Sequence, residues 1–411
     1  MASGRFTPSS NTTSGRVEPL PLTIWHAVGL GLVVRLLALA FLPDQQFPDA
    51  TAYETAGREL VDRGWMSVHI YMPLYPLWTA LWGGHTVLKL ADIALSAATI
   101  WLVWRLALET FTNPVGALLA ALAAAVYPHF IFFAVSRLTE TPYIFLICLA
   151  FLLLYRGRFT AASVVLVLSI LLRPATDFFA PILILVFVLL DRRRSWRFAV
   201  SCLARYFVIY AVLMAPWWAH QYAKYGQFVR LDLGDGIVLY SGNNPLNQSG
   251  GSVDVSEKGR DFDLTPFVGI EAGIERNAAL RRAAFDYIAE NPGHFVAMAG
   301  VKFVRFWRLW PYAPEYEKPA IIVLSLASYG VVLGLALVFL ARDGWRFWRP
   351  VLPMALFAAF LTAVHMVTVS SVRYRLPVEP FLILLAAQAM RPWLDRMPWL
   401  GRWMGATVRA S

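Results

Sequence analysis

Long apolar runs separated by short polar connections cover most of this chain. The runs are about 15 to 22 residues long, close to the roughly 20 residues that a helix needs to cross the hydrocarbon core of a bilayer. The pattern predicts an all-α polytopic membrane protein with about 10 transmembrane helices. The predicted spans are residues 22–42, 86–108, 115–135, 142–156, 158–172, 176–190, 198–218, 320–341, 350–369 and 376–391.

Two regions are too polar to cross the membrane and too long to be simple connections. The first, 43–85, contains an amphipathic stretch at 50–64 followed by an aromatic segment. The second, 219–319, has helical periodicity over 273–311. The Trp, Phe, Arg and Lys residues in the second half of that segment are typical of a helix lying on the membrane interface.

Composition supports the membrane interpretation. Hydrophobic residues make up 58% of the chain and charged residues 15%, whereas a typical soluble protein has about 25% charged residues. Cys148 and Cys202 both lie within apolar runs, which is typical of small buried hydrophobes rather than of a disulfide or a metal pair.

The formal net charge of +10 is concentrated in the short connections 156–158, 191–197 and 341–349. Short loops rich in Lys and Arg tend to stay in the cytoplasm. This distribution therefore predicts that both termini are cytoplasmic and that the two long regions lie outside. A high content of Arg and Ala favours a GC-rich bacterial genome, so the predicted location is a bacterial plasma (inner) membrane.

These assignments divide the chain into five parts. The first 20 residues are rich in Ser, Thr, Gly and Pro and are predicted to form a disordered cytoplasmic tail. The apolar run that follows is too long for a cleaved signal peptide and is expected to remain as an anchor. The parts are 1–20, an N-terminal transmembrane bundle at 21–218 with the outer loop 43–85, an extracytoplasmic loop at 219–319, C-terminal transmembrane helices at 320–391, and a cytoplasmic tail at 392–411.

Several arginines depart from the cytoplasmic pattern. Arg35 falls inside the first predicted span, and four others fall at outer ends of spans. A charge at such a depth is costly unless it is paired or hydrated. One interpretation is snorkelling of the side chain towards the interface, and the other is a phosphate site, since the guanidinium fork matches phosphate oxygens. The four arginines are Arg137, Arg173, Arg373 and Arg375.

Two carboxylates follow the first span, in the sequence "FPDATAYETAG". Asp49 has two interpretations: a solvated acid that starts a helix, or a general base that takes a proton from an acceptor while a bond to a lipid phosphate breaks. Glu54 lies five residues further on, so a helix would turn it away from Asp49. A structural role is therefore expected for Glu54.

Three further motifs have both a structural and a functional interpretation. Arg137 and Glu140 could form a local ion pair, or Arg137 could bind phosphate while Glu140 orients it or helps to hold a metal. Asn243 and Asn244, in "SGNNP", fit a tight turn or a set of ligands for sugar hydroxyls. Glu379 lies one helical turn after Arg375 and could compensate its charge.

Other patterns exclude function classes. The Asp-x-Asp sequence within 260–264 is expected to be a loop, because its predicted side of the membrane lacks nucleotide sugars. The histidines show no metal-ligand spacing. The sequence contains no Walker loop, no Gly-x-Gly-x-x-Gly and no Ser nucleophile elbow, which argues against an ATP-driven pump and a serine hydrolase. The aromatic residues suit membrane interfaces rather than nucleic acid.

Six segments occur in an order that resembles the integral-membrane GT-C glycosyltransferases. The nearest group is glycosyltransferase family 39, with its protein O-mannosyltransferases and lipid A aminoarabinose transferases. The likeness extends over nearly all of the chain after about residue 20. The segments are "FPDATAYETAGREL", "MPLYPLWTALW", "SRLTETPYIFLICLAFLLL", "LLRPAT", "SGNNP" and "RYRLPVEPFLILLAA".

The resemblance implies a GT-C-type bundle that uses a polyprenyl-phosphate-linked sugar as donor at the outer face. It implies Asp49 as the catalytic acid of the first outer loop and Tyr53 as the tyrosine that follows. The implied acceptor is a glycan, a lipid or a protein, with membrane lipids as neighbours and no nucleic acid. No cofactor is required by the resemblance, and a divalent cation is left open. Its implied donor-phosphate ligands are Arg137, Arg173 and Arg375, with Arg373, Glu140, Asn243 and Asn244 as further candidates for substrate binding.

One departure from the family and two alternatives qualify this expectation. Many relatives have Asp-Glu in the first loop, whereas this chain has Asp49-Ala50, which bears on the acceptor. One alternative is a polymerase or ligase of lipid-linked glycans. The other is a lipid flippase or transporter, which would place charges near the middle of the membrane and make the two halves related; only Arg35 meets the first criterion.

Overall fold

The computed structural model describes residues 22–44, 47–67, 70–191, 193–251, 261–312, 316–394 and 396. The regular elements within these residues are all helical, which confirms the predicted all-α class. The predicted tail at 1–20 and most of the tail at 392–411 lie outside the described residues. The helices are α1 (Ile24–Phe41), α2 (Pro48–Arg63), α3 (Leu74–Trp82), α4 (His85–Phe111), α5 (Pro114–Ala125), α6 (Pro128–Phe133), α7 (Glu140–Tyr155), α8 (Phe159–Leu172), α9 (Phe179–Leu190), α10 (Trp196–Tyr225), α11 (Asp235–Gly242), α12 (Ile274–Glu290), α13 (Pro292–Trp307), α14 (Pro319–Ser325), α15 (Val331–Asp343), α16 (Trp348–Val367), α17 (Glu379–Ala389) and α18 (Arg391–Leu394), with 3-10 turns η1 (Pro174–Thr176), η2 (Thr265–Phe267) and η5 (Val372–Val378) and a π-turn, η4 (Leu326–Gly330).

Five helical stretches are long and apolar enough to cross a membrane. They are α1, α4, α10, the continuous stretch from α14 to α15, and α16. Four shorter apolar helices, α5, α7, α8 and α9, pack with them. One predicted span, 115–135, is broken into α5 and α6, because Pro128 at the start of α6 has no N–H to continue the helical hydrogen bonding.

Helix α17 forms the centre of the bundle. Every residue from Glu379 to Ala389 is buried, and the helix packs against α15, α5 and α4. Helix α5 presents a buried stripe of Gly and Ala, which lets α1 and α17 approach its backbone closely. The residues of α5 and α17 are mostly apolar in the sequence, so hydropathy located both helices. Which helices lie beside them is a result of tertiary packing.

Arg35 links three helices inside the bundle. Its side chain is fully buried in α1, and its Nε donates to the Ser96 hydroxyl of α4 at 2.7 Å. Its Nη1 donates to the carbonyl oxygens of Gly31 and Ala125, each at 2.9 Å. The Ala125 carbonyl belongs to the last turn of α5, where carbonyls lack helical partners and the helix dipole favours a cation. These hydrogen bonds satisfy the buried charge of Arg35 and hold α1, α4 and α5 together.

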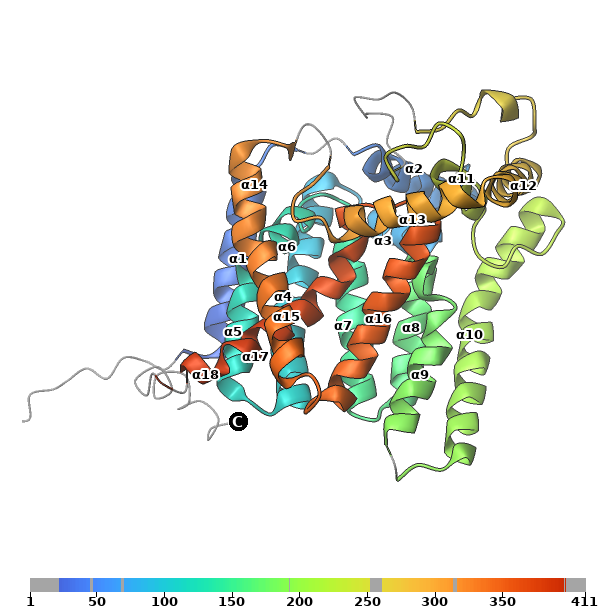
Figure 1. Cartoon of the computed structure of the whole chain (residues 1–411). Coiled ribbons are helices and arrows are strands. Elements are labelled where there is room, and N and C mark those ends of the chain that lie inside the picture. The colour runs from blue at the N-terminus through green and yellow to red at the C-terminus, as the bar shows by residue number, and fades with distance from the viewer. Residues whose placement is uncertain are drawn as a thin grey trace, which may run out of the picture.

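The two ends of the bundle differ in what they carry (Figure 1). One end carries α2, α3, α11, α12 and α13, and we call it the long-loop end. The other carries the α7–α8, α9–α10 and α15–α16 connections, and we call it the arginine-rich end. The predicted helical segment 273–311 is two helices, because Pro292 starts α13 where α12 has ended.

Candidate active site at the long-loop end

Asp49 lies in the first turn of α2, where Pro48 occupies the first helical position. A carboxylate at a helix N-terminus is favoured by the helix dipole. Its Oδ2 accepts a hydrogen bond from Nη1 of Arg373 at 2.8 Å. The Asp49 side chain is 42% exposed, so this carboxylate combines a charged partner with access for a ligand.

Arg373 joins Asp49 to a second carboxylate. It lies at the start of η5, where the Ser371 hydroxyl accepts a hydrogen bond from its backbone N–H. Its Nε donates to Glu140, and its Nη2 lies 3.4 Å from Oε2 of the same residue. Burial alone would lower the pKa of Arg373, but the carboxylates of Glu140 and Asp49 raise its pKa well above the ordinary value. Arg373 is therefore a permanent cation.

Glu140 holds a pair of arginines. It is fully buried at the start of α7, and its Oε1 also accepts a hydrogen bond from Nη1 of Arg173 at 3.2 Å. The Arg173 guanidinium lies over the Tyr374 ring, 5.1 Å from the centroid, and Tyr374 stacks on His365. Asp49, Glu140, Arg173 and Arg373 thus form one cluster drawn from four separate segments, which we call the four-charge cluster.

Arg137 belongs to a neighbouring group. The structure pairs Arg137 with Glu54 at 2.5 Å and with Asp44 at 3.6 Å, and Glu54 also contacts His85 at 2.7 Å. The interpretation in which Glu140 pairs with or orients Arg137 is therefore wrong. Arg137 adopts a left-handed backbone with φ of 55°, a strained conformation that costs about 1 kcal/mol.

Glu54 faces partners different from those of Asp49, in agreement with their five-residue separation on α2. Its carboxylate is 12% exposed, and it ties α2 to Arg137 and to the first residue of α4. Glu54 is therefore a structural residue that orients α2, and the orientation of α2 in turn places Asp49.

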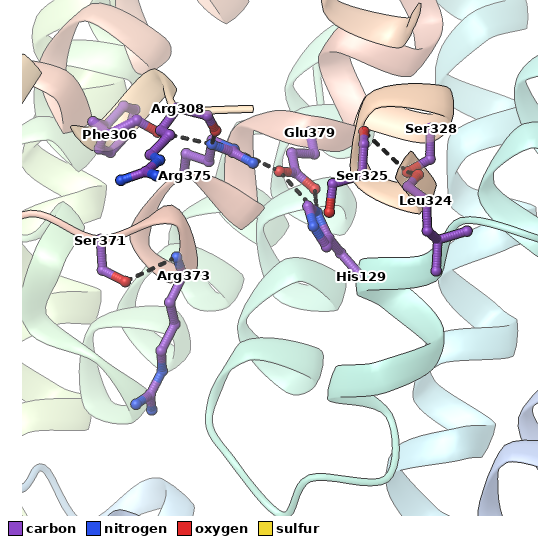
Figure 2. Close-up of polar contacts among 10 residues, drawn as sticks. All are labelled: His129, Phe306, Arg308, Leu324, Ser325, Ser328, Ser371, Arg373, Arg375 and Glu379. Atoms are coloured by element: carbon purple, nitrogen blue, oxygen red, sulfur yellow. Dashed lines mark hydrogen bonds and ion pairs between the residues drawn. The ribbon is translucent and has the colours of Figure 1, made fainter. Parts of the chain in front are cut away.

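The side chains of Arg375 and Arg373 point in different directions, although only one residue separates them (Figure 2). The Arg375 side chain is fully buried, and its Nε donates to Glu379 at 2.8 Å, which confirms the expected pairing one turn apart. Nη1 donates to the backbone carbonyls of Phe306 and Arg308.

The other side of Glu379 contacts His129 at 2.9 Å (Figure 2). The Arg375 guanidinium also lies 3.5 Å from the centroid of the Tyr329 ring. This network joins η5 and α17 to α6, α13 and η4. It places Arg375 in the interior, where the side chain supports η5 rather than facing an open surface.

Tyr53 lies one turn after Asp49 on α2. It is half-buried between the rings of Tyr71 and Tyr75, with centroids 4.3 Å and 4.9 Å away. Burial raises the pKa of the Tyr53 phenol, and the charges of Arg373 and Asp49 also act on it. The phenol therefore stays protonated and can donate a hydrogen bond.

Asn243 and Asn244 lie inside the long-loop end. Both are buried, and their amide nitrogens donate to backbone carbonyls, those of Leu239 and Val367 for Asn243 and those of Tyr240, Ser241 and Asp261 for Asn244. These bonds hold the turn after α11 in place. The structure thus gives both asparagines the geometry of a scaffold, which was the structural alternative for "SGNNP".

Sequence reasoning missed the cations that complete this scaffold. Lys302 of α13 is fully buried, with its Nζ 3.4 Å from the Asn243 side-chain oxygen. Arg305 donates from Nε to the Ser370 carbonyl at 2.7 Å. The basic residues of 273–311 indicated a membrane interface, and only the i, i+3 spacing of Lys302 and Arg305 marks a shared face.

The described residues bring together no group of three His, Cys, Asp or Glu side chains that could hold a metal ion. What the four-charge cluster offers is an exposed carboxylate beside two arginines that a buried glutamate holds in place. Such a cluster can accept a proton at Asp49 and bind an anion at Arg373 and Arg173.

No family model matches the chain, and no curated protein matches it. Solved structures of other membrane proteins are similar to it over most of its length. One is the oligosaccharyltransferase AglB of Archaeoglobus fulgidus, in complex with an inhibitory peptide and a dolichol-phosphate, with 13% identity and a TM-score of 0.54 over 93% of this chain and 52% of that chain. Another is ArnT of Cupriavidus metallidurans bound to undecaprenyl phosphate, with 16% identity and a TM-score of 0.52 over 92% of this chain and 62% of that chain.

The chain therefore spans about half the length of AglB and about three fifths of ArnT. ArnT in the apo state gives a similar result, with 17% identity and a TM-score of 0.55. Both neighbours are GT-C membrane glycosyltransferases. At these levels of identity the likeness is one of architecture alone. This chain has the GT-C membrane fold.

Proposed function

We propose that this protein is a glycosyltransferase that moves a sugar from a polyprenyl-phosphate-linked donor to an acceptor. The observation that carries the proposal is the four-charge cluster at the long-loop end of a GT-C fold, where the exposed Asp49 contacts Arg373 at 2.8 Å. The two neighbours support the choice of donor, since AglB is described with a dolichol-phosphate and ArnT with undecaprenyl phosphate.

In the proposed reaction, Asp49 accepts the proton of an acceptor hydroxyl or amine as that atom attacks the anomeric carbon. The bond between this carbon and the phosphate oxygen breaks, and polyprenyl phosphate leaves with its electron pair. Arg373 and Arg173 stabilise the negative charge that grows on the leaving phosphate. A phosphate that takes over Nη1 of Arg373 also releases Asp49 from its ion pair, so donor binding prepares the base.

The remaining residues have supporting roles in this proposal. Glu140 holds the side chains of Arg173 and Arg373 next to each other. Tyr53 donates a hydrogen bond to the lipid-linked sugar. Arg137 orients α2 through Glu54, and Arg375 supports η5 from inside. Asn243 and Asn244 keep the loop after α11 in the shape that admits the acceptor.

The proposed location is a bacterial plasma membrane with the long-loop end outside. The connections rich in arginine share the opposite end (Figure 1), as the positive-inside rule requires if that end is cytoplasmic. The transferred sugar would be a hexose or a pentose, and the acceptor a glycan, a lipid or a protein that reaches the long-loop end.

The test is sugar transfer by purified protein in liposomes that contain a panel of labelled polyprenyl-phosphate sugars. Release of polyprenyl phosphate by the wild type establishes the donor class. Asp49→Asn should reduce this release by about 100-fold or more, the usual contribution of a general base. Asp62→Asn, an exposed acid on the same helix α2, is the matched control and should leave release unchanged.

Three outcomes would contradict the proposal. Equal release by wild type and Asp49→Asn would refute the general base. Elongation of lipid-linked oligosaccharides, with no use of monosaccharide lipids, would indicate a polymerase or ligase. Movement of the lipid across the bilayer without cleavage would indicate a flippase.

A further inference from the structure

Two adjoining recesses lie at the arginine-rich end, far along the bundle from the four-charge cluster. The first has a volume of about 400 Å³ and lies between the ends of α7, α9 and α16. The second, of about 430 Å³, lies between the start of α8 and α10. Phe159 and Arg194 line both, so the two recesses adjoin, and we call them together the basic recess.

Positive charge dominates the lining of the basic recess. Five arginines and one carboxylate, Asp191, occur among its described lining residues. Asp191 is paired with Arg194 at 2.8 Å, so it compensates only one of the five. The arginines are Arg156, Arg158, Arg194, Arg205 and Arg349.

Two of these arginines are held in position by the fold. Arg194 lies over the rings of Phe159 and Phe198, at 5.1 Å and 4.3 Å from their centroids, and is 29% exposed. Arg156 is 25% exposed and uses its Nε on Glu109 at 2.7 Å, while its enclosed Nη2 has no hydrogen-bond partner among the described residues. These contacts fix both guanidinium groups at the lining of the basic recess.

The walls of the recess are apolar as well as basic. Leu154, Phe187 and Leu190 line it on the side of the bundle interior. Exposed tryptophans occur at the starts of α10 and α16 and in the connection before α16, with Trp196 70%, Trp348 48% and Trp345 69% exposed. Exposed Trp side chains typically lie at the level of lipid headgroups. A ligand here would have its anionic group among arginines and its apolar part against leucine and phenylalanine.

We propose that the basic recess binds the phosphate group of an acidic membrane phospholipid, with the acyl chains along Phe187 and Leu190. Basic pockets between transmembrane helices bind such headgroups in other membrane proteins. The α7–α8 and α9–α10 connections, which contribute to this recess, lie at the opposite end of the bundle from α2 (Figure 1), so the site is separate from the proposed donor site. A lipid here would join the ends of α7, α8, α9 and α10 and stabilise the bundle.

The test measures lipid binding to the full chain in detergent by native mass spectrometry, together with the unfolding temperature. Phosphatidylglycerol is compared with phosphatidylcholine and with inorganic phosphate. Arg205→Gln/Arg349→Gln removes two exposed arginines of the recess. Arg197→Gln/Arg346→Gln, at the same end but outside the recess, removes the same charge and is the control.

We expect the wild type to retain phosphatidylglycerol in preference to phosphatidylcholine and to gain thermal stability from it. The recess variant should bind phosphatidylglycerol at least about tenfold more weakly, since each arginine near a lipid headgroup contributes several-fold to affinity. Arg205→Lys/Arg349→Lys keeps the charge and should recover most of the binding, which separates lost binding from a damaged fold.

Other outcomes would overturn the proposal. An equal loss in the control variant would mean that total charge at this end, and not the recess, attracts acidic lipids. No preference for phosphatidylglycerol in the wild type would exclude the site. Stabilisation by inorganic phosphate as strong as that by phosphatidylglycerol would show that the recess takes free phosphate and that the acyl chains contribute nothing.

Discussion

At the scale of single residues, the candidate site depends on charges whose burial differs. Asp49 is 42% exposed, whereas Glu140 is fully enclosed between Arg173 and Arg373. An exposed ion pair contributes little to stability, but removing one partner of a buried pair leaves the other charges uncompensated. The two carboxylates of one cluster should therefore respond differently to neutralisation.

Glu140→Gln should destabilise the protein by about 3 to 5 kcal/mol, because two arginines lose their shared buried partner. Asp49→Asn should change the unfolding temperature little while reducing the proposed transfer by about 100-fold or more. Thermal unfolding in detergent, measured for both variants beside the transfer assay, compares them directly. An unfolding temperature of Glu140→Gln equal to that of the wild type would show that Glu140 does not hold the arginines in place.

Asp232, in the connection between α10 and α11, should make the stability of the protein depend on pH. Burial raises the pKa of Asp232 from 3.8 to about 7, and nearby Asp235 adds to the shift. Between these values the folded protein keeps a proton that the unfolded chain has lost, so stability falls as pH rises from about 4 to 7. Above pH 7 the free energy of unfolding is lowered by the full amount that this pKa shift causes.

Asp232→Asn should remove this loss of stability, because the amide oxygen can still accept the Gly234 N–H bond, 3.0 Å in the wild type, and cannot ionise. The unfolding temperature of the variant should exceed that of the wild type at pH 8, and the difference should vanish near pH 4. Asp62→Asn, which changes an exposed acid in the same way, serves as the matched control. A difference that is the same at both pH values would refute the titration of Asp232.

At the scale of elements, hydrogen bonds and a close backbone approach hold α11, α13 and the segment after α16 together. The Ser370 N–H donates to the Gly250 carbonyl at 2.9 Å, and the Ser370 hydroxyl donates to the Lys302 carbonyl at 2.8 Å. Gly242, the last residue of α11, lies so close to Thr368 that a Cβ would come within 2.0 Å of its carbonyl oxygen. This close approach fixes where the long loop meets the bundle.

Gly242→Ala should therefore loosen the long-loop end, since the backbone of residue 368 cannot yield as a flexible side chain could. Limited proteolysis should cut within 219–319 several-fold faster in this variant than in the wild type. Gly269→Ala is the control, because nothing lies within 4 Å of its Cβ position. Equal cleavage of both variants would contradict a role for this contact.

At the scale of the whole molecule, the separation of the two ends is the feature on which the proposed orientation depends (Figure 1). Asp62 is exposed at the long-loop end, and Trp345 is exposed at the arginine-rich end. The two native cysteines, Cys148 and Cys202, are buried, so they should give a low background in labelling experiments. Single introduced cysteines can therefore report which end faces outwards.

Asp62→Cys should react with a membrane-impermeant maleimide on intact cells, and Trp345→Cys should react only after the membrane is opened. This follows from the positive-inside rule applied to the arginine-rich end. Labelling of Trp345→Cys on intact cells would reverse the orientation. It would also move the proposed site to the cytoplasmic side, where a donor facing outwards could not reach it.

The amino-acid sequence by itself determined the features that depend on local pattern. Apolar run length located most helices of the bundle, and the short basic connections predicted two unlike ends. The breaks at Pro128 and Pro292, which divide two of the predicted segments, are local features of the sequence that hydropathy and helical period did not reveal. The pairing of Arg375 with Glu379 was also predictable, because four residues on a helix bring two side chains together.

Only the tertiary structure decided which charges meet. Arg373 contacts Asp49 across 324 positions of sequence and Glu140 across 233. Arg375, two residues after Arg373, turns inwards, and Arg137 turns to Glu54. Hydropathy and helical period describe neighbours along one helix, whereas contacts between helices follow from how the helices pack. The sequence could therefore identify these arginines and acids as candidates, and the packing of α2, α7 and η5 determines which of them are in contact.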